Sequence, residues 1–345
     1  MKHCVNFRNC PVTWDNALPI GNGNFGAMLY FDEDKLYMPM NHYEVYYTTS
    51  DKPFPNDRLE NMPLVDNPGE LHRSFKERAN RNQPPEGEPF ISYRTDRALL
   101  NKKKDQYGAG KWFGVHPATG DYIFYPNDAL RNGEYSLTLY AENACVSFNM
   151  SKESNALRID TIAARKDYII NKVTQSTPGM LSGFDLSMEP YRDLDAPEVV
   201  FQQVDDSTFR YSVTRVFEDP EKPFIFSGII HLVGARGTLC ADEYVGHITI
   251  TESEPEFYIL TGIYTPYRYA DPTSSGVSEI KEAANDLDTL YCDHQKYWKD
   301  FFSASSINIP DKFLETVYYI NQYTMDCCSG KNGIMKHQAC GLNGL

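Results

Sequence analysis

The sequence predicts a mainly β protein, a large antiparallel β-sandwich followed by helices. From Phe25 to about Tyr264, short segments alternate between apolar and polar residues and are separated by turn residues, a pattern typical of antiparallel strands. No helical period comes between these segments, which excludes a doubly wound α/β fold. After Tyr264 the apolar residues recur alternately three and four apart, which is the period of an amphipathic helix.

The candidate strands follow one another closely along the chain. In order, they are GEYSLTLYAEN, ACVSFNM, KDYIINKVTQS, GFDLSMEP, EVVFQQV, STFRYSVTRVF, PFIFSGIIHLVG, HITITES and EFYILTGIY. In the first of them, Tyr135, Leu137 and Leu139 occupy alternate positions, as one buried face of a sheet requires. We therefore expect each of these segments to be one strand of the sandwich.

Residues 50–130 interrupt the strand pattern. They are rich in Pro, Asn, Arg and Lys, and only Glu70–Asn80 has the spacing of a short helix. The rest reads as a long insertion or loop, and loops of this length in compact domains are usually functional or disordered. We expect this stretch to be separate from the regular strands.

Helices are predicted after the strands. TPYRYADPTSSG is a linker of turn residues, and Ser274 or Ser275 can cap the helix that follows it. The apolar stripe of that helix is continuous over about seven turns. It consists of Val277, Ile280, Ala284, Leu287, Tyr291, His294, Trp298 and Phe301. A second helix is predicted to begin within Asn308–Asp311 and to end near Gly330.

These changes of pattern divide the chain. We assign residues 1–265 to the β-sandwich, 266–303 to a linker helix and 304–345 to the start of a helical domain that is truncated. The second helix is apolar on several sides and therefore needs neighbours on several sides. Without them, the terminal region is expected to expose a large apolar surface. The residues expected on that surface are Trp298, Phe302, Phe313 and Tyr319.

Composition excludes several classes of function. The chain has 345 residues and a net charge of −14, whereas a nucleic-acid-binding surface needs clustered Lys and Arg. The basic run Lys102–Lys104 is short, and we interpret it as a solvated loop. No apolar segment approaches the roughly 18 residues that span a bilayer, so neither nucleic acid nor membrane is an expected partner. The content of 41% hydrophobic and 23% charged residues is that of a folded globular protein.

The amino terminus and the cysteines indicate a cytoplasmic protein. MKHCVNFRNCPVTW lacks the apolar core of a signal peptide, although a longer amino terminus would leave secretion open. The eight cysteines include no CxxC pair, which suits reduced thiols better than disulfides. Cys327 and Cys328 are adjacent and would point to different sides of a helix, so no metal site is expected.

The glycines of Leu18–Met28, LPIGNGNFGAM, have the spacing GxGxxG. A phosphate-binding loop requires a strand, a turn and a helix in that order. Here the glycines precede a predicted strand, FGAMLYF, and no helix is indicated after them. We therefore expect a tight turn in which glycine permits positive φ angles.

Glu44 is the carboxylate of greatest interest, because glycoside hydrolysis needs paired carboxylates across a sugar. Aromatic and polar residues surround it in MNHYEVYY, namely His42, Tyr43, Tyr46 and Tyr47. Such a cluster can contact a sugar ring, and the alternative is ordinary packing.

His294 lies on the apolar stripe one turn before Trp298, where packing is the favoured interpretation. No GxSxG, HExxH or Walker sequence is present.

Two segments at opposite ends of the chain resemble the glycoside hydrolases of family 95, the α-L-fucosidase and α-L-galactosidase group. WDNALPIGNGNFGAMLYF, from Trp14 to Phe31, is similar to the amino-terminal segment of that family. The run from Tyr267 to Tyr323, with the later GLNGL, is similar to its linker helix and first barrel helix. The family pattern is not followed by MNHYEVYY or by residues 50–130, so the resemblance does not define the sugar. Disaccharide phosphorylases, which have a similar leading sandwich, are the alternative relatives.

The resemblance implies a super-sandwich, a helical linker and an (α/α)₆ barrel that holds the catalytic groups. It implies inverting hydrolysis of an α-L-fucosyl or related bond, with a carbohydrate as partner and no metal or organic cofactor. The catalytic acid and the asparagine-assisted base would lie beyond Leu345, so no catalytic residue is assigned. Asn343, in GLNGL, would lie near the sugar pocket and joins Glu44, His42 and Tyr43 as a candidate substrate-binding residue.

The chain is therefore interpreted as the amino-terminal portion of such an enzyme, inactive without its barrel domain. Two other classes of function are left open by the residues. One is a stand-alone carbohydrate-binding sandwich that uses the Glu44 cluster or the long loop. The other is a structural domain that shields the barrel and shapes one wall of its pocket.

Overall fold

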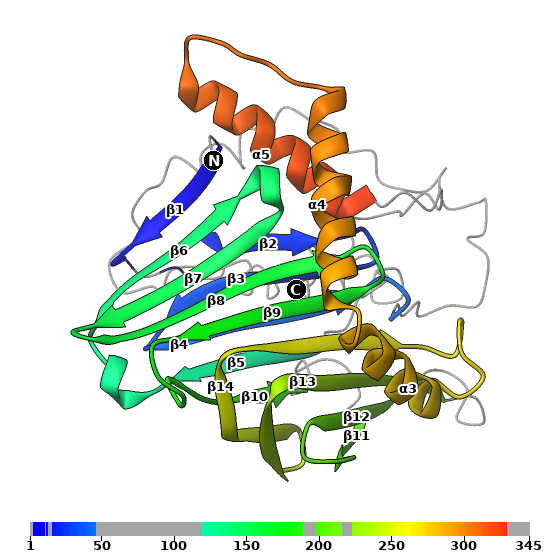
Figure 1. Ribbon diagram of the computed structural model, residues 1–345. Helices are drawn as coiled ribbons and strands as arrows, with labels where there is room; N and C mark the ends of the chain where they lie inside the picture. Colours follow the sequence, from blue (N-terminus) through cyan, green and yellow to red (C-terminus); the bar gives the residue numbers. More distant parts are fainter. Residues whose placement is uncertain are drawn as a thin grey trace, which may run out of the picture. The chain divides into compact units, whose positions relative to one another are not determined.

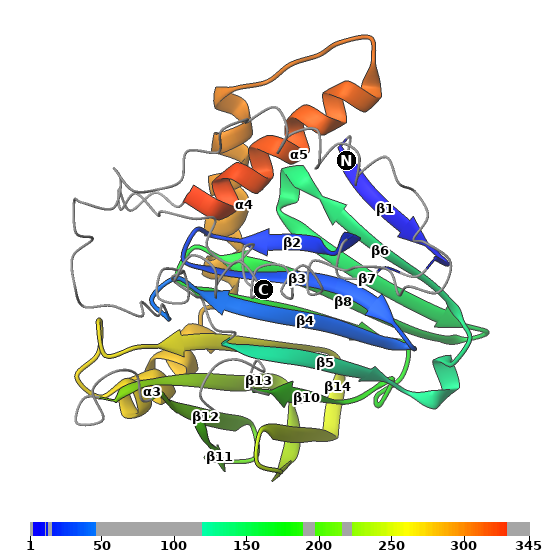
Figure 2. The same cartoon turned by 180° about the vertical axis from the view of Figure 1, so that it is seen from behind.

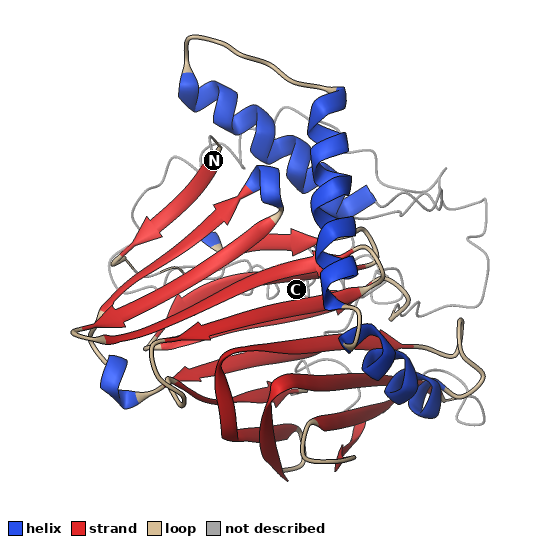
Figure 3. Ribbon diagram, viewed as in Figure 1, coloured by secondary structure: helices blue, strands red, loops and turns tan. Residues whose placement is uncertain are grey.

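The computed structural model combines one large antiparallel sheet with helices that follow it (Figures 1 and 3). It describes residues 3–10, 12, 16–45, 119–188, 197–215 and 223–329. The strands are β1 Cys4–Arg8, β2 Leu18–Gly21, β3 Phe25–Asp32, β4 Lys35–His42, β5 Gly120–Pro126, β6 Glu134–Tyr140, β7 Cys145–Lys152, β8 Asn155–Ala164, β9 Tyr168–Gln175, β10 Leu181–Ser187, β11 Glu198–Gln203, β12 Thr208–Arg215, β13 Phe224–Ala241 and β14 Val245–Tyr264. The helices are α3 Pro272–Ala284, α4 Leu287–Ala304 and α5 Lys312–Ser329, with short 3-10 helices η4 Asp128–Leu130 and η5 Ala141–Asn143.

The sheet folds back on itself into two facing layers (Figure 2). Its strand order is β1-β6-β7-β8-β9-β14-β10-β5-β4-β3-β2, and β13, β12 and β11 extend from β14. Strand β2, at one end of this order, contacts β6, β7 and β8, and β3 contacts β9. All of the pairings are antiparallel, so the predicted sandwich is confirmed.

Strand β14 belongs to both layers. Its first part, Val245–Thr249, pairs with β10, and its later part, Glu256–Gly262, pairs with β9. Strand β13 pairs with it on both sides of the bend, and the register shifts next to Gly234, whose φ is +79°. Pro255 lies in the same passage of β14, where the missing N–H removes one ladder bond.

The expectation of separate strands in HITITES and EFYILTGIY is wrong, because both segments belong to β14. The polar residues between them read as a turn in the sequence. Strand β13 remains paired through that passage, with Ala235 opposite Ser253 and Val233 opposite Tyr258. A long partner strand thus keeps the chain extended where composition alone favours a break.

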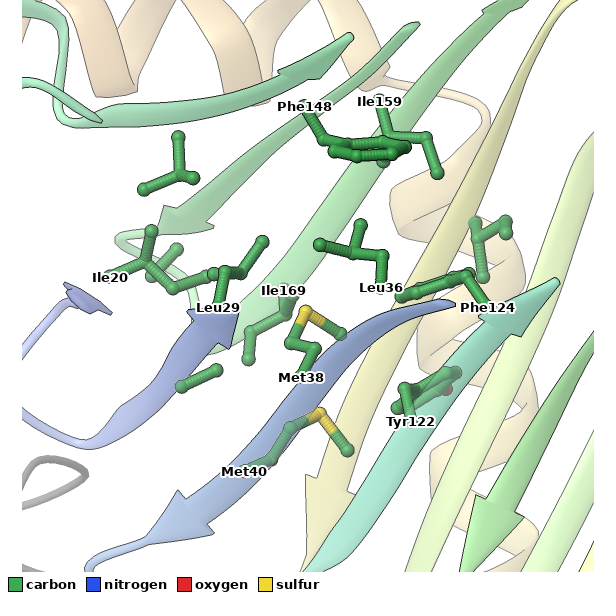
Figure 4. Packing of buried hydrophobic residues seen from close by; sticks show 14 of the residues in the cluster. Ile20, Leu29, Leu36, Met38, Met40, Tyr122, Phe124, Phe148, Ile159 and Ile169 are labelled. Carbon is green, nitrogen blue, oxygen red and sulfur yellow. The ribbon is translucent and has the colours of Figure 1, made fainter. Parts of the chain in front are cut away.

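Apolar side chains from the two layers meet in one core (Figure 4). The alternation on each strand directs every second residue inward. Phe31 of β3 packs on Phe148 of β7, with ring centroids 4.9 Å apart. Leu36, Met38, Tyr122, Phe124, Ile159 and Ile169 are among the buried residues that complete the core.

The predicted insertion ends earlier than residue 130. Strand β5 lies between β4 and β10 in the sheet, with Tyr122 and Phe124 buried. The alternating segment GDYIFY therefore forms a strand. The sequence interpretation assigned it to the insertion because Pro and Asn residues surround it. The helix predicted within Glu70–Asn80 lies outside the described residues.

The single linker helix predicted from the apolar stripe is two helices, α3 and α4. Asn285 ends α3 and Asp286 precedes α4, with a φ of −126°. The break does not separate two burial surfaces: Ile280 of α3 and Leu290 of α4 join the same cluster as Ile229 of β13, and Trp298, further along α4, joins the main core. The chain bends at Asn285 and Asp286, two residues of low helix propensity, and α4 then runs from the smaller cluster to the main core.

The helix caps differ in part from the prediction. Asp271, and not Ser274 or Ser275, caps α3 by accepting hydrogen bonds from the Thr273 and Ser274 N–H groups. Asp311 caps α5 in the same way through the Phe313 and Leu314 N–H groups, within the predicted start. None of the described helices combines the length and apolarity needed to cross a membrane.

Helix α5 packs directly on β2 and on His3, the residue before β1. The Tyr323 hydroxyl donates to the Pro19 carbonyl oxygen over 2.8 Å. A Cβ on Gly21 would lie 2.9 Å from the Cys327 carbonyl oxygen, so only glycine permits this approach. The Tyr319 ring stacks on His3 at 3.8 Å.

The expectation of an exposed Trp298, Phe302 and Tyr319 is wrong. Trp298 is fully buried, and Phe302 and Tyr319 are only 8% and 7% exposed. The sandwich itself, together with contacts between α4 and α5, supplies the neighbours that were expected from further helices. Phe313 is 74% exposed, as predicted.

Replacing Gly234 with alanine should lower the free energy of unfolding by about 2 kcal/mol. A side chain at positive φ costs about 1 kcal/mol, and a Cβ here would lie 3.3 Å from the Glu256 carbonyl oxygen. Gly179→Ala is the matched control, because Gly179 has a φ of +91° and open space around it. Urea unfolding of both variants measures the difference, and equal losses would contradict a crowded bend at Gly234.

Candidate functional site

Five polar side chains from distant parts of the sequence meet beside the turn that follows β2. They are Asn22, Asn24, Glu44, Asp167 and Arg268, and we call them the polar cluster. The two asparagines come from the β2–β3 turn, Glu44 follows β4, Asp167 lies in the β8–β9 turn and Arg268 follows β14. The antiparallel sheet brings these turns together because each lies at the end of a strand.

The glycine-rich segment forms the turn of the β2–β3 hairpin. The Asn22 side-chain oxygen accepts hydrogen bonds from the N–H groups of Asn24 and Phe25 at 2.9 and 2.8 Å, and Gly23 has a φ of +88°. The Asn22 amide donates to the Ala164 carbonyl oxygen over 2.6 Å. The predicted tight turn is confirmed, although a strand precedes it as well as follows it.

Arg268 lies between two carboxylates. Its Nε donates to Glu44 and its Nη1 donates to Asp167 Oδ2 over 2.5 Å. The Thr265 hydroxyl donates to the second Glu44 oxygen over 2.5 Å, and the Asn24 amide donates to both Asp167 oxygens at 2.9 Å. Burial lowers the pKa of Arg268, but the hydrogen bond and charge of Asp167 and the charge of Glu44 outweigh this and raise it. The guanidinium therefore stays charged.

All four carboxylate oxygens of Glu44 and Asp167 accept hydrogen bonds from protein groups. A general acid or base must instead direct an oxygen at the substrate. The polar cluster is thus arranged to hold turns in place and not to transfer protons. Among the described residues, no three His, Cys, Asp or Glu side chains are placed to hold a metal ion.

The structure brings three of the four candidate substrate-binding residues together. His42 is buried, packs edge-on against Phe25 at 5.6 Å and accepts from the Glu44 N–H at 3.3 Å. The Tyr43 N–H donates to the Asn24 carbonyl oxygen over 2.8 Å, and its side chain is partly exposed. Glu44 is 7% exposed. Asn343 lies outside the described residues.

Arg165 joins the polar cluster to the helices. Its Nη1 donates to the Asn22 carbonyl oxygen over 3.0 Å, and its Nη2 forms an ion pair with Asp326 of α5. The guanidinium carbon lies 3.3 Å from the centre of the Tyr297 ring of α4, and the Tyr297 hydroxyl donates to Asp326 over 2.7 Å. Burial and this hydrogen bond raise the pKa of Tyr297, so the phenol keeps its donor proton.

Among the comparisons with known proteins, only the comparison with solved structures gives matches, and these matches support the fold. No family model and no curated protein matches the chain. A solved protein from the human microbiome, assigned as a kojibiose phosphorylase, matches with a TM-score of 0.50 and 9% identity over 95% of this chain and 42% of that chain. The chain shares its fold with this carbohydrate-active protein. It spans less than half of that protein's length.

Two other matches are weaker. A GH92 family glycosyl hydrolase matches with a TM-score of 0.37 and 12% identity over 52% of this chain and 27% of that chain. A GH92 α-mannosidase from Bacteroides thetaiotaomicron, in complex with mannoimidazole, matches with a TM-score of 0.30 and 10% identity. This match covers 92% of this chain and 36% of that chain. Family 95 therefore remains a prediction from the sequence.

The sequence interpretation missed Arg165, Asp167, Arg268 and Asp326. A charged turn between two strands, such as ARKDY, is usually solvated, and nothing in the sequence distinguishes Arg165 and Asp167 from that pattern. Arg268 lies inside the segment that resembles family 95. That resemblance was the one feature of the sequence that could have marked Arg268 as a residue of the polar cluster.

Arg268→Met should lower the free energy of unfolding by about 2 kcal/mol. The substitution leaves Glu44 and Asp167 without their shared cation. Breaking a buried ion pair costs about 3–5 kcal/mol, but Arg268 is 35% exposed, so solvent screening reduces that cost. The control is Arg131→Met, whose partner Asp34 is 3.8 Å away and whose side chain is 66% exposed. Chemical denaturation should show a loss of about 0.5 kcal/mol or less for the control, and equal losses would refute a structural role for Arg268.

His294 is a packing residue, and its burial predicts an acid-sensitive stability. Its Nε2 lies 2.9 Å from the Asn143 carbonyl oxygen, and burial lowers its pKa from 6.5 to about 4. Between these values the unfolded chain binds a proton that the folded chain does not, so stability is lost as the pH falls from about 6.5 to about 4. The loss attributable to His294 is about 3 kcal/mol.

The matched variant is His294→Gln, whose amide can donate to the same carbonyl oxygen without titrating. Urea unfolding of both proteins between pH 7.5 and pH 4 should show that the wild type loses about 3 kcal/mol more than the variant. Parallel pH profiles for the two proteins would count against a buried neutral His294.

Proposed function

We propose that this chain is the amino-terminal β-sandwich, linker and first barrel helix of a glycoside hydrolase related to family 95. One observation supports the proposal most strongly: the two segments that resemble the family lie in contact, through Pro19 and Tyr323, which are 304 residues apart in the sequence. The Tyr323 hydroxyl donates to Pro19, and Cys327 packs against Gly21. Segments of one functional unit are expected to pack in this way.

The outward face of α5 supports the same proposal. Phe313, Leu314 and Met325 are 74%, 53% and 70% exposed, and exposed apolar patches usually mark an interaction surface. A hollow of about 420 Å³ lies beside this face, between α5 and β1, and Cys4, Val5 and Ile320 contribute to its lining. In the proposed enzyme, further barrel helices cover this face.

The proposed reaction of the parent enzyme is inverting hydrolysis of an α-L-fucosyl or related α-linked bond. One protonated carboxyl group assists departure of the leaving group, and a second polar group activates water. We propose that both groups lie in the barrel beyond Leu345. The sandwich then contributes a wall beside the sugar at His42, Tyr43 and Glu44, where the partly exposed Tyr43 makes the contact and the buried His42 and Glu44 hold it in place. Asn343 contacts the sugar from the barrel side.

The proposal predicts that the 345-residue chain does not hydrolyse 4-nitrophenyl α-L-fucoside. The product of the open reading frame extended beyond Leu345 should hydrolyse it, and NMR should detect β-L-fucose as the first product, because the mechanism inverts the anomeric centre. The Glu44→Gln form of the 345-residue chain is the control for contaminating activity. Turnover by the isolated chain that Glu44→Gln abolishes cannot come from a contaminant; it would show that the catalytic groups are already present in these 345 residues and would refute the proposal.

A further inference from the structure

A row of aromatic and polar side chains crosses the outward face of one layer. Neighbouring strands place Tyr30 opposite Tyr37, Tyr37 opposite Ile123, Ile123 opposite Asp185 and Asp185 opposite His247. Strands β3, β4 and β5, which carry the first half of this row, run side by side in Figure 2. The residues before and after each member are directed into the core, so the row faces outward.

The tyrosines of the row form a partly exposed aromatic surface. The rings of Tyr30 and Tyr37 stack with centroids 4.8 Å apart and 3° between their planes. Tyr125 lies two residues after Ile123 on the same face of β5, and the Lys35 ammonium group lies 5.6 Å from the centre of its ring. Each of these tyrosines is partly exposed. The rings therefore offer apolar surface to a ligand without being buried in the core.

Hydrogen-bonding groups continue the row beyond the rings. The Tyr125 hydroxyl donates to Asp185 Oδ2 over 2.5 Å, and His247 Nδ1 lies 2.8 Å from Asp185 Oδ1. The second ring nitrogen of His247 lies 3.3 Å from Asp242, which is 79% exposed. Burial and the hydrogen bond to Asp185 raise the pKa of Tyr125, so its phenol keeps the proton that it donates.

We propose that the tyrosine row, formed by Tyr30, Tyr37, Tyr125, Asp185 and His247, binds a neutral oligosaccharide. Aromatic rings provide rigid apolar surface with a polar end, which suits the C–H face of a pyranose. The Tyr125 proton and both His247 nitrogens are engaged with Asp185 and Asp242, but carboxylate and phenol oxygens have further lone pairs, which suit the hydroxyl donors of a sugar. A small number of polar groups beside an apolar surface is the usual composition of a small-ligand site.

Charge and topology exclude other ligand classes at this surface. The net charge of −14 and the nearby Asp242 repel a nucleic acid or an anionic polysaccharide. A peptide that adds a strand needs an unpaired sheet edge, but β4 pairs with β3 and β5, and β5 pairs with β4 and β10. An uncharged, hydroxyl-rich chain remains the best match to the row.

The tyrosine row is separate from the polar cluster and is independent of the proposed hydrolase reaction. It uses the outward side chains within β3, β4, β5, β10 and β14, whereas Glu44, Asp167 and Arg268 lie in turns and loops beyond the strand ends. Binding to the row therefore stands even if the parent enzyme acts on another bond. Its role would be to hold a glycan on the protein surface.

Electrophoresis of the 345-residue chain through gels that contain soluble yeast α-mannan or fucosylated xyloglucan tests this proposal. Migration should be slowed by at least one of these neutral glycans. Tyr37→Ala and Tyr125→Ala should each weaken the apparent affinity about tenfold, which corresponds to about 1.4 kcal/mol. Tyr125→Phe keeps the ring and loses the hydrogen bond to Asp185, so a smaller loss is expected.

Tyr258→Ala is the matched control. Tyr258 has a lysine, Lys172, at the same 5.6 Å from its ring and donates to Glu256 over 3.0 Å, but it is not part of the row. Circular dichroism melting of each variant shows whether the fold is kept, and Tyr125→Phe provides the comparison if an alanine variant unfolds. Unretarded migration of the wild type in both gels, or an equal loss for Tyr258→Ala, would overturn the proposal.

Discussion

The structure depends on β14 remaining one strand through both layers of the sandwich. Because Val245–Thr249 pairs with β10 and Glu256–Gly262 pairs with β9, the two layers are joined by continuous backbone and not only by side-chain packing. The paired strand β13 bends with it at Gly234. This constraint fixes which inward faces meet, and Phe31 and Phe148 then pack across the core.

The polar cluster fixes the turns at the strand ends with directional bonds. Apolar packing tolerates small displacements, whereas a guanidinium between two carboxylates has one favourable geometry. Arg268 holds Glu44 and Asp167, the asparagines of the β2–β3 turn hold Asp167, and Arg165 carries the connection to Asp326 in α5. The glycine-rich segment therefore connects the sandwich to the helices through hydrogen bonds. This structural role accounts for the glycines and the two asparagines of the turn without invoking phosphate binding.

The fold by itself does not decide the reaction. The solved protein that shares the fold is assigned as a phosphorylase, whereas the sequence segments point to a hydrolase. The two reactions differ in whether phosphate or water attacks the sugar, and no group in the polar cluster chooses between them. The described part of the chain is accordingly interpreted as a scaffold that positions helices and presents surfaces to carbohydrate, at His42–Glu44 in one proposal and at the tyrosine row in the other.

Four features could be predicted from the sequence: the antiparallel strands, the change to helices after Tyr264, the tight turn at Asn22–Asn24 and the packing role of His294. Each of these follows from local periodicity or from the φ angles that a residue permits, which neighbouring residues already encode. Three features depend on contacts between distant parts of the chain: β14 is one strand, the predicted linker helix ends at Asn285, and Arg165 and Arg268 face carboxylates more than 100 residues away. Charged residues in turns look alike in sequence, and their partners are set by the strand order, which no local pattern contains.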